Sequence, residues 1–176
     1  MKFQKTSIDG ALLIEVNKYS DARGYFMECW NERDFGLPKF VQDNFSQSKK
    51  GVLRGLHYQC FPVCQGKLVR CTNGSVYDVI VDLRQKSKTF GKWYGVKLDR
   101  PELILWAPPG MAHGFYTLSE VADFNYKVSN YYDNSAERVI AWDDSTLGIS
   151  WPLDGDPILS KKDIDGAKSF KECTKL

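Results

Sequence analysis

The stretch Gly51-Val-Leu-Arg-Gly-Leu-His57-Tyr58-Gln59, followed by Gln65-Gly-Lys67-Leu-Val-Arg70, decides the expected fold. It predicts two extended segments joined by a short loop that contains Pro62. Because side chains alternate along a strand, Leu53, Gly55 and His57 are expected on one face and Arg54 on the other. If the two segments pair, the His57 imidazole and the Lys67 ammonium converge on one pocket. A base beside a cation suits the removal of a proton next to a carbonyl group.

Extended patterns also dominate the rest of the chain, where 14% of the residues are aromatic. Asn73-Gly74 between two apolar runs is a strong hairpin signal, and helical periodicity is confined to 33–36 and to the segment after Ser160. Many short strands with regular turns predict an all-β sandwich or barrel, most simply a jelly roll, as one domain over residues 1–176. The expected strands are 11–16, 24–30, 52–58, 67–72, 75–83, 92–98, 102–107, 114–118, 124–129 and 138–141.

The expected strand 75–83 carries two acids, Asp78 and Asp82, on the face opposite Val79 and Val81. The spacing alone favours acids in water and an apolar face in the core. The alternative places both acids in the interior of a barrel, where a buried carboxylate needs a partner such as a histidine or a lysine.

Composition excludes several classes of function. A formal net charge of +2 lacks the concentrated basic surface of a nucleic-acid binder. No apolar run is long enough to span a membrane, and no apolar leader follows Met1. The five cysteines show no metal-binding or CxxC spacing, which is typical of reduced thiols in a cytoplasmic protein.

Ordered motifs along the chain resemble one family. The resemblance runs from about Phe3 to Asp163 and is carried by Asp21-x-Arg23-Gly-Tyr-Phe-x-Glu28, Gln42-Asp-Asn44-x-Ser-x-Ser48, Leu53-Arg-Gly-Leu-His-Tyr-Gln59, Gln65-Gly-Lys-Leu-Val-Arg70, Asp78-x-x-x-Asp-Leu-Arg84, Ser87-x-Thr-Phe-Gly-Lys-Trp93, Pro109-x-x-x-His-Gly-Phe115, Tyr126-Lys127, Tyr131-Tyr132 and Asp144-x-x-x-Gly-Ile-x-Trp-Pro152. The chain is similar to the dTDP-4-dehydrorhamnose 3,5-epimerases, which act on nucleotide-linked 4-keto sugars.

The resemblance implies a cupin-like jelly roll with short helical segments near the C-terminus, a homodimer, and no need for a metal or added cofactor. It implies that His57 is the general base and Asp163 its carboxylate partner, that Lys67 faces the C4 carbonyl oxygen, and that Tyr126 delivers a proton from the opposite face of the ring. It places His113 in substrate binding, with Asp78 as its buried partner. The positions that match residues binding the nucleotide and diphosphate are Arg23, Glu28, Gln42, Asn44, Arg54 and Tyr132, and in the family the Arg23 region comes from the partner chain.

Each of these residues also has a structural explanation when it is taken alone. Asp163 in Ser160-Lys-Lys-Asp163 has the spacing of a helix capping box. Lys67 reads as an exposed lysine, Tyr126 as a packed strand tyrosine, and Arg23 and Arg54 as members of surface ion pairs. The order of the motifs along the whole chain favours the catalytic interpretation.

Three alternative functions remain open at this point. One is an epimerase that inverts C3 only, or that acts on a GDP-linked 4-keto heptose. Another is a noncatalytic jelly roll that binds a sugar nucleotide, which has no use for a base, an oxyanion donor and an opposed acid together. The third is a metal-dependent cupin dioxygenase, which the absence of a His-x-His pair disfavours.

Overall fold

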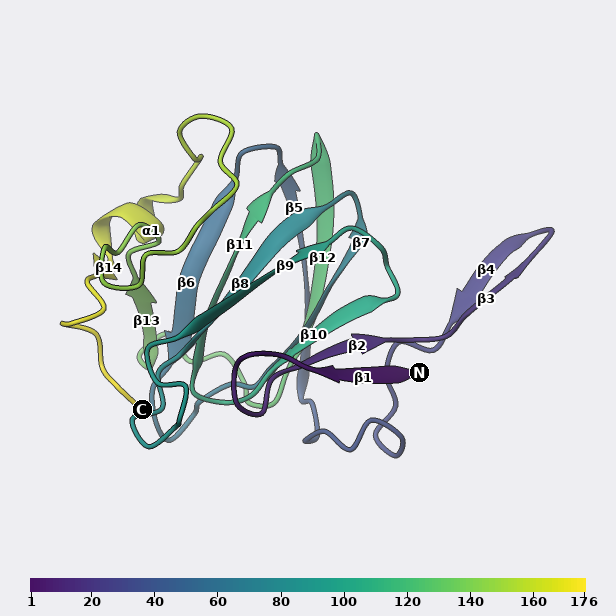
Figure 1. The fold of residues 1–176 in the computed structure, drawn as a ribbon, viewed down its shortest axis with the longest axis horizontal. Coiled ribbons are helices and arrows are strands. Elements are labelled where there is room, and N and C mark those ends of the chain that lie inside the picture. Colours follow the sequence, from purple (N-terminus) through teal and green to yellow (C-terminus); the bar gives the residue numbers. More distant parts are fainter.

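The computed structural model describes all 176 residues and contains two six-stranded sheets that face each other (Figure 1). All strand pairs are antiparallel except β13 with β14. The first sheet consists, in spatial order, of β1 (Lys2–Lys5), β2 (Leu12–Glu15), β10 (Leu103–Ala107), β7 (Lys67–Asn73), β12 (Val121–Val128) and β5 (Gln42–Lys49). The second consists of β14 (Ala167–Lys168), β13 (Glu137–Ile140), β6 (Leu53–Gln59), β11 (Met111–Thr117), β8 (Val76–Asp82) and β9 (Trp93–Leu98).

The all-β prediction is therefore confirmed, and so is the helix after Ser160, which is α1 (Lys161–Asp165). Figure 1 shows α1 and β14 beside β6 and β13, on the side of the molecule away from the hairpin of β3 (Lys18–Asp21) and β4 (Gly24–Met27). That hairpin projects from the body as an arm. The helical periodicity at 33–36 does not correspond to a helix, because the chain forms a turn and a bend there.

Apolar side chains form three clusters, of which the smallest packs Phe35 against Leu68, Ile104 and Trp106 of the first sheet. The cluster between the sheets includes Val69, Ile80, Leu105 and Phe124. A second cluster lies on the outer face of the second sheet, where the C-terminal segment covers Leu56, Tyr58, Val79 and Val81. Each fully buried aliphatic or aromatic side chain contributes about 1.5–3 kcal/mol of transfer free energy. Because β8 has apolar cover on both faces, every residue on it except Tyr77 is buried.

The hairpin expected at Asn73-Gly74 does not form. The turn joins β7 to β8, but β7 pairs with β10 and β12, whereas β8 pairs with β11 and β9. The chain therefore crosses from one sheet to the other at this turn. The two strands that carry His57 and Lys67, β6 and β7, likewise belong to different sheets and do not pair.

A β-bulge between β6 and β11 changes the expected faces of β6. His57 lies opposite His113 and Arg54 lies opposite Phe115, so three steps on β6 match two on β11. Directly opposite residues point to the same face of a sheet, and Phe115 belongs to the cluster between the sheets. Arg54 and His57 therefore share the inner face, against the prediction from simple alternation. Glycine is required here, because a Cβ on Gly55 would lie 2.6 Å from the Cα of Gly114.

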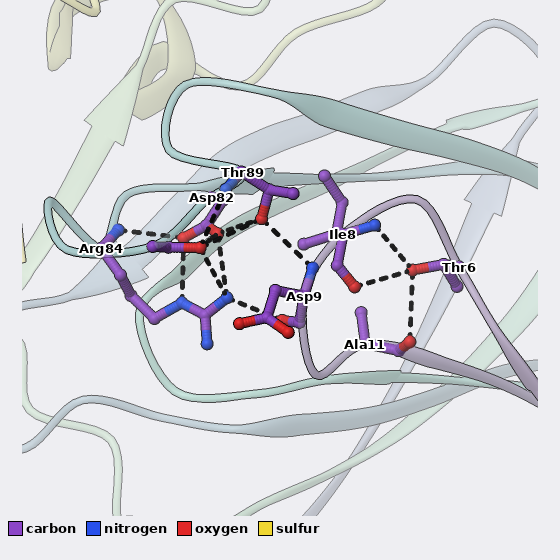
Figure 2. A network of polar contacts seen from close by, with 8 residues as sticks. Thr6, Ile8, Asp9, Ala11, Asp82, Arg84 and Thr89 are labelled. Carbon is purple, nitrogen blue, oxygen red and sulfur yellow. Dashed lines mark hydrogen bonds and ion pairs between the residues drawn. The ribbon is translucent and has the colours of Figure 1, made fainter.

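The two acids of β8 are both fully buried, so the interpretation favoured by their spacing is wrong. Asp82 accepts hydrogen bonds from the Arg84 guanidinium and from the hydroxyls of Ser87 and Thr89, as Figure 2 shows in part. Arg84 also donates to the carbonyl oxygen of Asp9, at 2.7 Å. These hydrogen bonds hold the loop between β1 and β2 against the end of β8.

Candidate active site

Two basic side chains converge from opposite sheets. Lys67, the first residue of β7, is buried, and its Nζ donates to the backbone oxygen of His57 at 3.2 Å. Burial lowers the pKa of Lys67 to about 8, while the charges of Glu137 and Asp78 oppose that shift. The alternative interpretation of Lys67 as an exposed lysine is therefore wrong. At neutral pH the ammonium is still the major form of Lys67, and its one hydrogen bond is to the backbone oxygen of His57.

His57 forms a pair with Asp163 of α1. Its Nε2 lies 2.6 Å from Asp163 Oδ1, and the carboxylate is almost completely buried. Burial disfavours the charged carboxylate, but hydrogen bonds from His57 and Ser160 prevail and lower the pKa of Asp163. Ser160 is also the N-cap of α1 and accepts from the Asp163 backbone N–H. Asp163 thus serves both as a capping-box residue and as the partner of the imidazole.

A second histidine–carboxylate pair lies beside the first. His113 stands directly opposite His57 in the β6–β11 ladder, and its Nε2 is 2.9 Å from Asp78 Oδ2. Its ring stacks on Phe124 with the centroids 6.0 Å apart. Burial raises the pKa of Asp78, although the charges of His113 and Lys67 oppose this shift, and Asp78 Oδ1 has no hydrogen-bond partner. The barrel-interior interpretation of this acid is therefore confirmed.

Tyr126 lies on β12, in the sheet that also supplies Lys67. It is opposite Val69 on one side and opposite Asn44 of β5 on the other. Its ring packs against the cluster between the sheets. Burial, aided by the charge of Glu137, raises the pKa of Tyr126, so the phenol keeps its proton at neutral pH.

Four of the residues expected to hold a nucleotide lie around this group. Gln42 donates to Asn44 at 2.8 Å and accepts from the backbone N–H of Tyr132 at 3.0 Å. Arg54 reaches across to β5 and donates to the Ser48 hydroxyl at 3.0 Å. The Arg54–Ser48 hydrogen bond therefore joins β6 of the second sheet to β5 of the first sheet beside the site.

Arg23 and Glu28 lie elsewhere in this chain. Arg23 is at the turn of the β3–β4 arm, is 89% exposed, and pairs only with Asp21. Glu28 follows β4 and accepts a hydrogen bond from Asn31. Neither side chain contacts the group built on His57 and Lys67.

Sequence reasoning missed one residue of the site, Glu137 on β13. It accepts a hydrogen bond from the Tyr132 hydroxyl at 2.6 Å and forms an ion pair with Lys162 of α1. Burial disfavours its charge, yet these two partners lower the pKa of Glu137. No local motif marks this position, because all its partners come from other segments.

The arrangement suits proton transfer at carbon. It holds an imidazole backed by a carboxylate, an ammonium whose donors are largely unused, and a protonated phenol. No group of three His, Cys, Asp or Glu side chains is placed to hold a metal ion. None of the helices has the length and apolar character needed to cross a bilayer.

Comparisons with known proteins converge on one family. Residues 5–172 match the sequence profile of the family described as "dTDP-4-dehydrorhamnose 3,5-epimerase". The chain is 50% identical to such an epimerase from Shigella flexneri over 174 residues, 96% of each chain. A crystal structure of the Elizabethkingia anophelis enzyme superposes with a TM-score of 0.91 at 47% identity, covering 97% of both chains. The Legionella pneumophila 3,5-epimerase in complex with dTDP-4-keto-L-rhamnose superposes with a TM-score of 0.90 at 46% identity, covering 94% of this chain and 91% of that one.

Proposed function

The chain belongs to the dTDP-4-dehydrorhamnose 3,5-epimerase family, and from that premise we propose how its residues carry out the reaction. It is an isomerase with the cupin fold of that family, and it inverts C3 and C5 of a dTDP-linked 4-keto-6-deoxy sugar in rhamnose biosynthesis. The observation that carries the proposed mechanism is the meeting of the His57–Asp163 pair and the Lys67 ammonium from opposite sheets.

His57 acts as the base that removes the proton from the carbon next to the C4 carbonyl. A C–H beside a ketone is a far weaker acid than imidazolium, whose reference pKa is about 6.5. The enolate oxygen that forms must therefore be stabilised as its charge develops, and Lys67 supplies that donor. Asp163 holds the imidazole in one orientation and favours its charged form after proton uptake.

Inversion requires a proton from the other face of the sugar ring, and Tyr126 supplies it. Its raised pKa keeps the phenol protonated and able to donate. The same sequence of deprotonation and reprotonation at the second carbon completes the double epimerisation. His113, with Asp78 behind it, binds substrate next to His57, and Arg54, Gln42, Asn44 and Tyr132 bind the nucleotide diphosphate.

We extend the proposal to a homodimer that completes this site. The arm presents Tyr25 and Phe26 to solvent, 53% and 68% exposed, beside Arg23. The edge strand β5 has a free side, because it pairs only with β12. An arm laid along a partner's β5 would bring Arg23 and Glu28 next to Gln42 and Asn44.

The single-domain organisation and a cytoplasmic location are part of the same proposal. Asp163 from the C-terminal part of the chain and His57 from the N-terminal third build one site, which supports one domain over residues 1–176. The five cysteines are all free, as expected in a reducing compartment.

Deuterium exchange tests the mechanism directly. The enzyme is incubated with dTDP-4-keto-6-deoxyglucose in deuterated water, and C3 and C5 are followed by NMR. We expect label at both carbons, and a loss of at least about 10²-fold in exchange rate in both His57→Ala and Lys67→Ala. Lys97→Met, which removes an exposed ion pair with Asp99, serves as the matched control with wild-type rates.

Two results would contradict this assignment. An undiminished exchange rate in His57→Ala would exclude His57 as the base. Label at C3 alone in the wild type would make the enzyme a C3 epimerase.

A further inference from the structure

Helix α1 carries Asp163 but has almost no apolar contact with the rest of the protein. Asp163 is its only buried residue, and Ile164 is 62% exposed. None of its residues belongs to a core cluster. The side-chain contacts that fix its position are therefore polar, and they come from Asp163 itself and from Lys162.

Lys162 contacts Glu137, which is the residue that no sequence motif marked. Glu137 is only 11% exposed, and its Oε2 accepts from both Lys162 and the Tyr132 hydroxyl. The Lys162 ammonium also lies 5.8 Å from the centre of the Tyr132 ring. One carboxylate thus joins a helix to a residue on the nucleotide side of the site.

The position of Glu137 also places its charge near the reacting groups. β13 runs beside β6, with Val139 opposite His57 and Glu137 opposite Gln59. Two carboxylates favour the ammonium form of Lys67, and Glu137 has a larger effect on the pKa of Lys67 than Asp78 has. The charge of Glu137 also contributes to the raised pKa of Tyr126.

We propose that Glu137 is a positioning residue of this epimerase, which ties Tyr132 to α1 and thereby holds Asp163 and the His57 ring in the reactive orientation. This inference rests on the proposed roles of His57 and Tyr132. Binding of the nucleotide against Tyr132 is then coupled to the orientation of the base through a single carboxylate. A second effect of Glu137 is to keep Lys67 charged at higher pH.

The effect of Glu137 on the protonation of Lys67 distinguishes the proposed positioning role from a purely structural one. The charged groups that act on Lys67 are Glu137 on β13 and Asp78 on β8. Its direct strand neighbours, Ala107 on β10 and Val128 on β12, carry no charge, and the other titratable groups of the site are His57 on β6, His113 on β11 and Tyr126 on β12. Glu137→Gln removes only one of these charges and keeps the shape of the side chain. The alkaline limb of kcat/KM, which reports loss of the Lys67 proton, is therefore expected to move to lower pH.

The experiment measures kcat and KM for dTDP-4-keto-6-deoxyglucose across pH in Glu137→Gln, in Lys162→Met and in the double variant. Each single change is expected to lower kcat/KM by about 10- to 100-fold, because small misplacements of reacting groups have effects of this size. The double variant is expected to lose no more than the worse single one, because both changes break one connection. Only variants without the Glu137 carboxylate should show the shifted alkaline limb. Lys97→Met is again the control.

The outcomes are distinguishable. Wild-type kcat/KM and an unmoved alkaline limb in Glu137→Gln would overturn the inference, while activity in the wild type would leave the proposed function intact. An inactive wild type would instead refute the proposed function. If Glu137→Gln does not fold, Lys162→Met decides: full activity overturns the inference, and a loss of kcat/KM with an unchanged unfolding temperature supports it.

Discussion

Replacing Lys67 by Met removes a buried ammonium and keeps most of the side-chain volume, and we expect the variant to be inactive yet more stable than the wild type. Lys67 is buried and has a single hydrogen bond, from Nζ to the His57 backbone oxygen. A buried ammonium with so few partners lowers the stability of the folded protein.

The magnitude follows from the pKa. Burial lowers the pKa of Lys67 from 10.5 to about 8. Each pKa unit corresponds to about 1.4 kcal/mol, so the wild type loses about 3 kcal/mol at pH 7 by holding the ammonium in the folded state. Between pH 8 and 10.5 the unfolded chain binds more protons at this residue than the folded one does. The stability of the wild type relative to Lys67→Met therefore rises with pH in this window.

The assay is urea unfolding of both proteins at several pH values. Lys67→Met is expected to be about 3 kcal/mol more stable at pH 7, about 1 kcal/mol more stable at pH 9.5, and equal to the wild type above pH 10.5. Lys97→Met, on the surface, should differ from the wild type by less than about 0.5 kcal/mol throughout. Equal or lower stability of Lys67→Met at pH 7, or a difference that does not shrink as the pH rises, would refute the reasoning.

Three further substitutions test other parts of the structure. Tyr126→Phe keeps the ring in its packing beside Phe124 but has no phenol proton, so NMR in deuterated water should show exchange at C5 without inversion; full inversion would exclude Tyr126 as the acid. Asp163→Asn leaves His57 without its carboxylate and should lower kcat/KM by at least about 10²-fold in a steady-state assay, whereas an unchanged value would make Asp163 only a helix cap. Gly55→Ala places a Cβ 2.6 Å from the Cα of Gly114 and should lower the free energy of unfolding by at least about 2 kcal/mol. Gly148→Ala, at a positive φ with open space, is its control and should cost about 1 kcal/mol; equal losses in the two variants would show that the bulge tolerates a side chain.

Much of the fold and of the candidate site could be predicted from the sequence. Alternating patterns located most of the strands, because successive side chains point to opposite faces of a strand and this pattern can be read from a few adjacent residues. The segments Lys2–Lys5, Lys18–Asp21 and Gln42–Lys49 were missed as strands, because they are polar or largely exposed and lack an apolar face. His57 and Lys67 were identified together as candidates, since they lie in two neighbouring motifs separated by a short loop.

The geometry of that pair was not predictable from the motif. The sequence suggested that the two segments pair, whereas β6 and β7 lie in different sheets and the two residues meet across the interior. The partners of a strand depend on the whole set of strands that competes for each edge. The β-bulge that turns Arg54 inward also arises only from the ladder between β6 and β11.

The sequence by itself determined the fold class and the family, because these follow from local alternation and from ordered motifs, and it supplied His57, Lys67 and Tyr126 as the candidate base, cation and opposed acid. The resemblance implied the pairs His57–Asp163 and His113–Asp78, but only the tertiary structure showed the geometry that forms them across the fold. It alone revealed that Glu137, which no motif marked, joins Tyr132 to α1. A polar side chain is buried only where a partner compensates its loss of water. That partner comes from a distant segment, so no local pattern can specify it.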